Sequence, residues 1–298
     1  MKSGFVSIVG RPNVGKSTLL NSILQRKIAI TSDKSGTTRN IIEGVYNDSE
    51  SQIIFVDTPG IHKPRHKLET ILNKKAYAMT KDIDLVLFLV DIKDGFGKGD
   101  EFILDKLKQE ERDVILILTK IDKLKNKPVL LKEIDKLKEL YPFKEIVPIS
   151  AVKNINIDSL IKTIKKYLKD DIIYYDEDYI TNLPTNLMVS ELVREKILRN
   201  TEEEIPHSVT CYVEEYEEEE KLVRLGVLIV VDRDNLKKII IGKNGSMLKK
   251  IGTEARSDLE EYFGKKVYLS LYVKTLKNWR DKELYLKELG LKDDLDIE

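Results

Sequence analysis

The segment Gly10-Arg-Pro-Asn-Val-Gly-Lys-Ser17 constrains the fold more than any other part of the sequence. It follows an apolar run at residues 5–9 and opens a stretch with helical spacing at 15–25. Its two glycines let the backbone curl so that N–H groups point at phosphate oxygens, and the helix N-terminus adds positive potential. Strand, glycine-rich turn and helix in this order predict a phosphate-binding loop. We expect Lys16 to reach the terminal phosphates of a nucleotide and the Ser17 hydroxyl to bind Mg²⁺.

Three shorter motifs, each at the end of an apolar run, narrow the choice of nucleotide. Asp57-Thr-Pro-Gly60 offers a carboxylate for Mg²⁺, through water, and the Gly60 N–H for the γ-phosphate. Thr119-Lys-Ile-Asp122 ends in a carboxylate that can accept both N–H groups of a guanine edge, which adenine does not offer. The backbone of Ser150-Ala-Val-Lys153 can cap the guanine oxygen. GTP with Mg²⁺ is therefore the predicted ligand, and GTP hydrolysis is the predicted reaction. The predicted metal ligands are Ser17, Thr38 and Asp57. The predicted nucleotide-binding residues are Gly10, Asn13, Val14, Gly15, Lys16, Ser17, Thr18, Thr37, Thr38, Asp57, Gly60, Thr119, Lys120, Asp122, Ser150, Ala151 and Val152.

The loop before the second strand contains two adjacent threonines. A threonine hydroxyl here can complete the Mg²⁺ shell only when a γ-phosphate is present; Thr38 is favoured for this role and Thr37 remains an alternative. Ile61 stands where Ras-like proteins place a water-orienting glutamine, so slow hydrolysis is expected. Either His62 or His66 could act as a base, and exposed loop histidines are the favoured interpretation of both.

Short apolar runs alternate with helical patterns through the first part of the chain. This alternation predicts a P-loop α/β domain, a mostly parallel sheet with helices on both faces. Two runs, 41–46 and 52–56, flank a polar turn and predict an antiparallel hairpin at the sheet edge. The second strand of this hairpin has its apolar residues at 53–56, and further strands are predicted at 5–9, 85–90, 114–118 and 146–149. The predicted helices cover 15–25, 67–80, 100–110, 128–140 and 156–168.

An acidic, aromatic segment that starts at Asp170 and is followed by Pro184 breaks this pattern. Beyond it the order becomes helix, strand, strand, helix, helix, strand, which predicts a separate small α+β domain. We therefore expect domains at 1–170 and 187–275, an interdomain linker at 171–186 and a helical tail at 276–298. The elements expected in the second part are 186–200, 207–216, 222–232, 234–241, 246–263 and 267–274.

Between the last two of these helices lies Ile239-Ile-Ile-Gly-Lys-Asn-Gly-Ser-Met-Leu-Lys-Lys-Ile251. Its G-x-x-G core would let an RNA backbone approach closely, beside the positive N-terminus of the following helix. This extended motif, inside that order of elements, is typical of type II KH domains, which bind single-stranded RNA. Trp279 with Arg280 could stack on a base, and packing at the domain edge is an equal alternative. The predicted RNA-binding residues are Ile241, Gly242, Lys243, Asn244, Gly245, Lys249, Lys250, Arg256 and Trp279.

Composition sets the expected compartment. A single cysteine, Cys211, allows no intramolecular disulfide and fits a reducing compartment; its alternating surroundings predict a half-buried strand thiol. The 51 Lys and Arg residues balance the 51 Asp and Glu residues, so the net charge is zero and only the charge of individual segments is informative. The glutamate-rich run 214–220 predicts a solvated hairpin tip that faces away from any polyanion. Because no apolar run approaches the length of a membrane span, we expect a soluble cytoplasmic protein.

The nucleotide motifs resemble those of the translation-factor-related small GTPases. In that family an asparagine matching Asn13 is associated with potassium bound beside the phosphates. The resemblance therefore implies a possible K⁺ site and adds Asn13 to Lys16, Thr38 and Gly60 as catalytic residues. Thr119 departs from the usual asparagine and lacks the carboxamide that ties this loop to the P-loop, so weaker base affinity is expected.

A GTPase domain followed by one type II KH domain resembles the Era family over essentially the whole chain, including 178–181, 191–196 and 273–280. The resemblance implies binding to small-subunit ribosomal RNA near its 3′ end and a role in 30S subunit assembly and maturation. It also implies a monomer with peripheral contact at the inner face of the cell membrane. Two alternatives stay open: a GTP-dependent RNA-modifying enzyme, and an RNA-binding scaffold with a vestigial nucleotide site.

Overall fold

The computed structural model describes residues 1–34, 37, 39–57, 66–71, 83–124, 127–169, 171–289 and 291, without the side chains of Lys127 and Glu288. These residues form two compact units. The first comprises 1–29, 38–63 and 73–182, and the second comprises 30–37, 64–72 and 183–298. The break after residue 182 falls inside the segment 171–186, and two short pieces from the first part of the chain group with the second unit.

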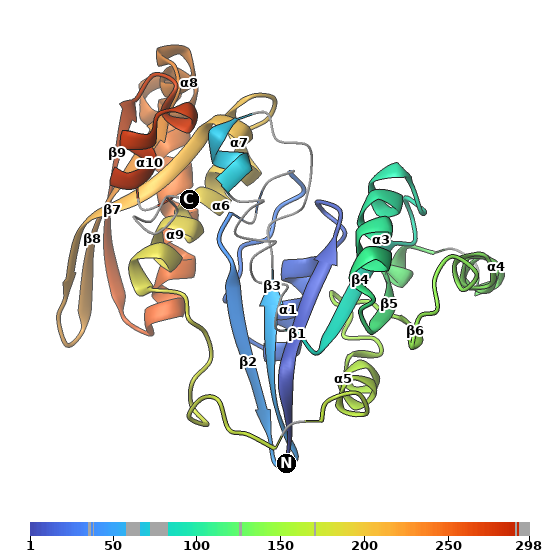
Figure 1. The fold of residues 1–298 in the computed structure, drawn as a ribbon. Coiled ribbons are helices and arrows are strands. Elements are labelled where there is room, and N and C mark those ends of the chain that lie inside the picture. Colours follow the sequence, from blue (N-terminus) through green and yellow to red (C-terminus); the bar gives the residue numbers. More distant parts are fainter. Residues whose placement is uncertain are drawn as a thin grey trace. The chain divides into compact units, whose positions relative to one another are not determined.

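The first unit is built on a six-stranded sheet with the order β2-β3-β1-β4-β5-β6 (Figure 1). Adjacent strands run parallel except β2 and β3, which form the predicted antiparallel hairpin with β2 at the edge. The central strands are buried along their whole length, as their uninterrupted apolar runs require. The strands are β1 (Lys2–Gly10), β2 (Ile42–Asp48), β3 (Ser51–Asp57), β4 (Leu85–Asp91), β5 (Val114–Thr119) and β6 (Glu145–Pro148).

Helices flank this sheet close to where their spacing predicts them. One core cluster joins β4 and β5 to helices α3 and α4 through Phe88, Leu104 and Leu137. Helix α1 packs against β2 at Gly44, where a Cβ would lie 2.6 Å from the nearest atom of Leu24. The helices are α1 (Lys16–Leu24), α3 (Lys98–Glu110), the 3₁₀ turn η1 (Ile121–Lys123), α4 (Lys127–Leu137) and α5 (Ile157–Lys165); of the helix expected at 67–80, only residues up to 71 are described.

The segment that joins the two units is tied to the sheet edge. The Gln52 side chain accepts the N–H groups of Tyr174 and Tyr175, at 2.7 and 3.0 Å. The Val45 N–H donates to the Ile180 carbonyl at 2.8 Å, which pairs the edge strand β2. The predicted linker therefore covers the open edge of the first sheet up to residue 182.

The second unit has the predicted α-β-β-α-α-β order, an α+β domain with a three-stranded sheet, β7-β8-β9. Strand β8 pairs antiparallel with β7 and parallel with β9. A short helix, α7, occupies the start of the strand expected at 207–216. The elements are α6 (Thr185–Asn200), α7 (Ile205–Ser208), β7 (Val209–Glu218), β8 (Leu222–Val231), α8 (Asp234–Ile241), the 3₁₀ turn η2 (Lys243–Gly245), α9 (Ser246–Phe263), β9 (Lys266–Thr275), the 3₁₀ turn η3 (Trp279–Asp281) and α10 (Glu283–Glu288).

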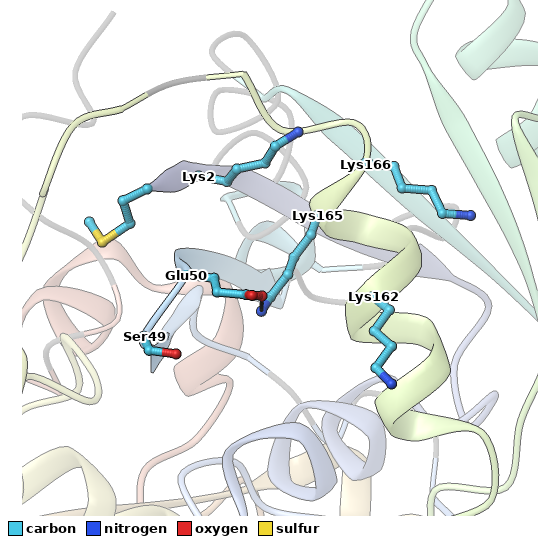
Figure 2. Close-up of a pocket in the computed structure, with 7 residues that line it drawn as sticks. Lys2, Ser49, Glu50, Lys162, Lys165 and Lys166 are labelled. Atoms are coloured by element: carbon cyan, nitrogen blue, oxygen red, sulfur yellow. Dashed lines mark hydrogen bonds and ion pairs between the residues drawn. The ribbon is translucent and has the colours of Figure 1, made fainter.

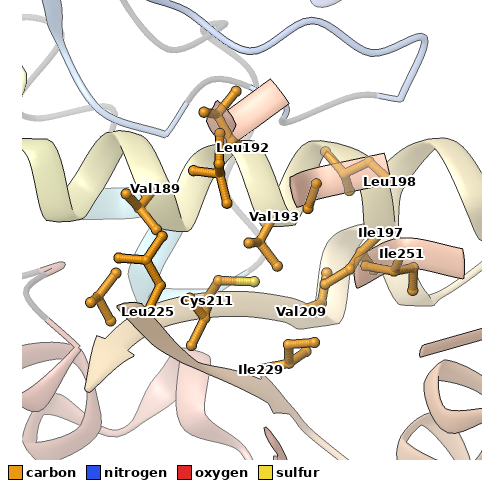
Figure 3. Close-up of a cluster of buried hydrophobic side chains, with 14 of the residues drawn as sticks. Val189, Leu192, Val193, Ile197, Leu198, Val209, Cys211, Leu225, Ile229 and Ile251 are labelled. Carbon is orange, nitrogen blue, oxygen red and sulfur yellow. The ribbon is translucent and has the colours of Figure 1, made fainter. Parts of the chain in front are cut away.

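The core of this unit lies between the sheet and helices α6 and α9. Figure 3 shows Val193, Ile197 and Ile251 packed against side chains of β7 and β8. Cys211 belongs to this cluster and lies in β7 as predicted, but at 8% exposed it is buried rather than half-buried. Among the described helices, none is both long and apolar enough to cross a membrane.

Candidate nucleotide site and RNA-binding loop

The phosphate-binding loop connects the end of β1 to the start of α1, as predicted. Gly15 and Asn13 both adopt positive φ, 104° and 66°, which turns successive N–H groups toward one side of the loop. A Cβ on Gly10 would lie 2.8 Å from the Leu89 carbonyl oxygen, so only glycine fits between β1 and β4. Helix α1 begins at Lys16, which places its N-terminus at the loop.

Three side chains meet at the base of this loop. Lys16 is 7% exposed, and its ammonium donates to the Gly10 and Arg11 carbonyls at 3.3 and 3.4 Å. Burial lowers the pKa of Lys16, and the nearby Asp57 carboxylate opposes this shift. The Ser17 hydroxyl donates to Asp57 Oδ2 at 2.7 Å.

Asp57 has the character of a magnesium-binding carboxylate. It is fully buried, and burial raises its pKa, with Lys16 and Ser17 acting in the opposite direction. Its Oδ1 atom is buried and accepts no hydrogen bond from the described residues. A buried carboxylate oxygen without a donor, next to a serine hydroxyl, fits a hard divalent cation that takes its other oxygens from phosphates and water.

The base-recognition motifs come together as predicted. The Ser150 hydroxyl donates to Asp122 Oδ1 at 2.5 Å and accepts the Lys153 N–H at 3.2 Å. Lys120 donates to the Asn13 carbonyl at 2.7 Å and pairs with Asp91 at 2.6 Å. The Ser150 hydroxyl thus orients the Asp122 carboxylate, and Lys120 links this loop to the P-loop.

One expectation about this loop is wrong. Thr119 does tie its loop to the P-loop, because its hydroxyl donates to the Val14 carbonyl at 2.7 Å. It also lies 3.3 Å from the Val90 carbonyl, and the residue is 4% exposed. A threonine can reach the P-loop backbone without a carboxamide because β5 ends directly beside Val14.

Sequence reasoning missed Arg11 and Asp100. The Arg11 guanidinium pairs with the buried Asp100 carboxylate, Nε to Oδ2 at 2.7 Å, and donates to the Gly95 carbonyl at 2.8 Å. Burial raises the pKa of Asp100, while the Gly97 N–H and Arg11 act to lower it. The two residues are far apart in sequence, so no motif spacing indicated that α3 anchors the P-loop.

The predicted switch residues are described only in part. Thr38, Gly60, Ile61 and His62 lie outside the described residues. The Thr37 hydroxyl donates to the Lys34 carbonyl at 2.6 Å. His66 Nδ1 lies 3.0 Å from Asp281 Oδ2 in the second unit, so the structure pairs this histidine with a carboxylate.

A large pocket lies away from the P-loop, at the N-terminal end of β1. It measures about 610 Å³ and is lined by Met1, Lys2, Ser49, Glu50, Lys162, Lys165 and Lys166. Figure 2 shows its lysines pointing in different directions. Lys165 is already paired with Asp48 and Glu50, at 2.6 and 3.1 Å, so the pocket does not focus positive charge on one point.

The G-x-x-G loop of the second unit has the predicted geometry. Gly242, Asn244 and Gly245 adopt φ of 73°, 51° and 76°. A Cβ on Gly242 would lie 2.8 Å from the Met247 backbone nitrogen, so a side chain there would push into the first turn of α9. Around this loop Lys243, Asn244, Lys249, Lys250 and Arg256 are exposed, and Ile241 and Gly245 are partly exposed.

Trp279 cannot stack on a base in this structure. It is fully buried, and its indole Nε1 donates to the Ser208 carbonyl at 3.0 Å. It packs with Leu286 and Val230 over the outer side of β8. The packing alternative is therefore confirmed, and Arg280 beside it pairs with Asp232 at 2.5 Å.

Comparison with known proteins agrees with this geometry. A family model of 50S ribosome-binding GTPases matches residues 5–120, and a KH domain model matches residues 204–280. A variant of Era from Aquifex aeolicus, solved with GDP and AlF₄⁻, is 42% identical with a TM-score of 0.94, and the match covers 98% of this chain and 100% of that one. Era solved with MgGDPNP and nucleotides 1506–1542 of 16S ribosomal RNA is 42% identical with a TM-score of 0.92, again covering 98% and 100%. The chain therefore belongs to the Era family of GTPases.

Proposed function

We propose that this GTPase binds small-subunit ribosomal RNA near its 3′ end and assists assembly of the 30S subunit. The observation that carries the proposal is the exposed glycine loop at the N-terminus of α9, with Lys243, Lys249 and Lys250 around it. Such a loop can hold an RNA backbone through N–H groups and ammonium groups. Its support is the related Era structure that contains the 3′-terminal segment of 16S ribosomal RNA.

The nucleotide site supplies the hydrolytic activity. Among the described residues the Lys16 ammonium donates to two carbonyls, and burial disfavours its charge. Phosphate oxygens would restore the charged form, so Lys16 would hold the β- and γ-phosphates. Ser17 and Asp57 would hold Mg²⁺, which when bound neutralises charge that develops on the phosphate oxygens. Asp122, held by Ser150, would read the guanine edge.

We further propose that the bound nucleotide controls RNA affinity through residues 30–37. This segment precedes the switch threonine and packs on α6 within the second unit. The buried Glu195 carboxylate accepts the Thr31 N–H at 2.8 Å, and Ile30 lies in the same hydrophobic core as α6. If GTP repositions this segment, α6 must respond, and by linkage RNA would favour the GTP-bound form to the same degree.

The proposed RNA contact can be tested with a labelled oligonucleotide from the 3′ end of 16S ribosomal RNA. Gly242→Asp adds a negative charge and a side chain at positive φ, and it should reduce RNA affinity at least tenfold. Gly264→Asp is the matched control, because Gly264 also has positive φ, 63°, and ends α9. Lys249→Ala with Lys250→Ala should weaken binding without strain in the loop. Equal RNA binding by all these variants would disprove the contact.

GTP turnover separates an active switch from a scaffold with a vestigial site. We expect slow turnover that Lys16→Ala abolishes.

We also propose that the protein is a cytoplasmic monomer that makes peripheral contact with the inner face of the cell membrane. The family resemblance alone supports the membrane contact. Sedimentation of the purified protein and flotation with anionic lipid vesicles test these two points, and no flotation would remove the membrane contact.

A further inference from the structure

The sheet of the second unit has one face packed on helices and one face that the described residues cover only in part. Alternate residues of β8, such as Val227 and Ile229, are buried in the main core. On the opposite face Val230 is covered by Trp279 and Leu286. Beyond this cover the strand pairing places Tyr212, Leu228 and Tyr272 in one row, Glu215, Gly226 and Ser270 in the next, and Glu217, Arg224 and Tyr268 in a third.

Three tyrosines keep much of their surface exposed on this face. The exposed fractions are 41% for Tyr212, 50% for Tyr272 and 60% for Tyr268. The face of an aromatic ring carries negative potential, which attracts a guanidinium or an ammonium group. These rings therefore offer a surface for cations as well as for apolar contact.

The same face carries carboxylates. Glu215 lies over the row between the tyrosines, because a Cβ on Gly226 would be 2.9 Å from Glu215 Oε2. In the adjoining turn Glu218 pairs with Lys265 at 2.7 Å. No ion pair reaches Glu215 or Glu217 within the described part of the chain. The six glutamates of residues 214–220 thus leave a negative potential beside the tyrosines.

One arginine of the chain already uses this chemistry. The Arg224 guanidinium lies over the Tyr268 ring, 6.0 Å from its centroid, and its Nε donates to Glu219 at 3.2 Å. Ring and carboxylate together hold the cation. Glu215 lies one row and Tyr272 two rows from this pair on the same face, and together they offer a ring and a carboxylate to an outside cation.

We propose that the surface formed by Tyr212, Tyr272, Glu215 and Glu217, beside the ring of Tyr268 that Arg224 already occupies, docks an arginine-containing basic segment of a partner protein. Arginine side chains would lie on the tyrosine rings and pair with the two carboxylates. RNA does not suit this surface, because its phosphates would meet the glutamates of residues 214–220. This acidic, aromatic surface therefore differs in charge from the lysine-rich loop at the start of α9.

The test uses the full chain bound to GDP and a short fluorescent peptide in which arginine alternates with glycine. Tyr212→Ala with Tyr272→Ala should weaken peptide binding about tenfold, because each exposed cation–π contact contributes about two- to fivefold in affinity. Tyr212→Phe with Tyr272→Phe keeps both rings and should bind as the parent does. Glu215→Gln with Glu217→Gln should also weaken binding.

Glu202→Gln with Glu203→Gln is the matched control for charge, because both residues are exposed and the net change is the same. The control should leave peptide binding unchanged, and a lysine–glycine peptide should bind more weakly than the arginine peptide. The proposal fails if binding is not saturable or if the control weakens it as much as the Glu215 and Glu217 changes. It also fails if the alanine variant loses affinity for the ribosomal oligonucleotide rather than for the peptide.

Discussion

The guanidinium of Arg194, on helix α6, donates a hydrogen bond to the backbone carbonyl of Thr37. Arg194 is fully buried, and Glu191 holds it through Nε at 2.8 Å and Nη2 at 2.6 Å. A charged pair on helix α6 thus binds the backbone of Thr37, which precedes the predicted switch threonine in the sequence. This contact gives the proposed coupling between nucleotide and RNA a definite place in the second unit.

Loss of Arg194 should destabilise the fold. Arg194→Met leaves the Glu191 carboxylate buried without its cation, so the free energy of unfolding should fall by about 3–5 kcal/mol. The double variant Arg194→Met, Glu191→Met removes both charges and should lose clearly less. Urea denaturation of the three proteins measures the difference. Equal stability of the single variant and the parent would show that the pair is not buried as described.

The double variant also tests the coupling. It removes the contact to Thr37 while it avoids the isolated buried charge. We expect its RNA affinity to differ less between a non-hydrolysable GTP analogue and GDP than that of the parent. An unchanged ratio of the two affinities would show that the coupling does not depend on the Arg194–Thr37 contact. Another contact of this segment, such as that of Glu195 with Thr31, would then have to carry it.

The Thr119 hydroxyl should contribute to nucleotide binding. Thr119→Val keeps the shape of the side chain but leaves the Val14 carbonyl without this donor, so affinity for GDP should fall about five- to tenfold, the worth of one hydrogen bond. Thr119→Ser keeps the hydroxyl and should lose less. Equilibrium titration with a fluorescent GDP derivative measures both. Valine binding as tightly as threonine would make the hydrogen bond irrelevant to affinity.

Hydrolysis should depend on the monovalent cation. The resemblance implies that Asn13 binds K⁺ beside the phosphates, and the structure holds Asn13 at positive φ in the P-loop, with Lys120 bound to its carbonyl. Turnover of GTP should therefore be faster in K⁺ than in Na⁺ at equal ionic strength. Asn13→Ala should abolish the difference. Equal rates in both salts would remove potassium from the account.

Acid should weaken the hairpin of the first sheet. Burial alone would raise the pKa of Asp48, but hydrogen bonds from Lys165, the Glu50 N–H, Ser51 and Tyr46 bring it down from 3.8 to about 2. Because the folded pKa is the lower one, these bonds stabilise the fold above the unfolded pKa, and this contribution is lost as pH falls through the folded pKa. The full shift corresponds to about 2.5 kcal/mol at neutral pH, and solvent screening of this partly exposed carboxylate should reduce it to about 1–2 kcal/mol.

Asp48→Asn checks this linkage. The variant should unfold at lower urea than the parent at neutral pH, and the gap should close as pH falls from the unfolded to the folded pKa of Asp48. Glu139→Gln, on an exposed residue, serves as a control for the loss of one negative charge. A gap that stays constant with pH would show that Asp48 acts through its shape and not through its charge.

The sequence predicted those parts of the fold that depend on neighbouring residues. The P-loop and the Gly242–Gly245 turn each lie between two elements, so spacing alone located them. The interactions of Thr119 with Val14 and of Arg11 with Asp100 join distant segments, and no local pattern indicates such partners. For the same reason the sequence did not decide between base stacking and packing for Trp279, because its burial depends on Val230 and Leu286.

Helix α6 shows the limit most clearly. Its charged residues Glu191, Arg194 and Glu195 would be exposed on an ordinary amphipathic helix, but all three are buried. Thr31 donates to Glu195 and Thr37 accepts from Arg194, and only the three-dimensional fold brings these two residues to the helix. The proposed route from nucleotide to RNA was therefore not visible in the sequence.

If the bound nucleotide sets RNA affinity, the protein must bind the RNA differently in its two nucleotide states. The dissociation constant for the 3′-terminal 16S ribosomal RNA oligonucleotide is measured with the full chain in a non-hydrolysable GTP analogue and in GDP, at one salt concentration. We expect clearly tighter binding with the analogue, and loss of that binding in Gly242→Asp. Equal affinity in the two nucleotide states would contradict it.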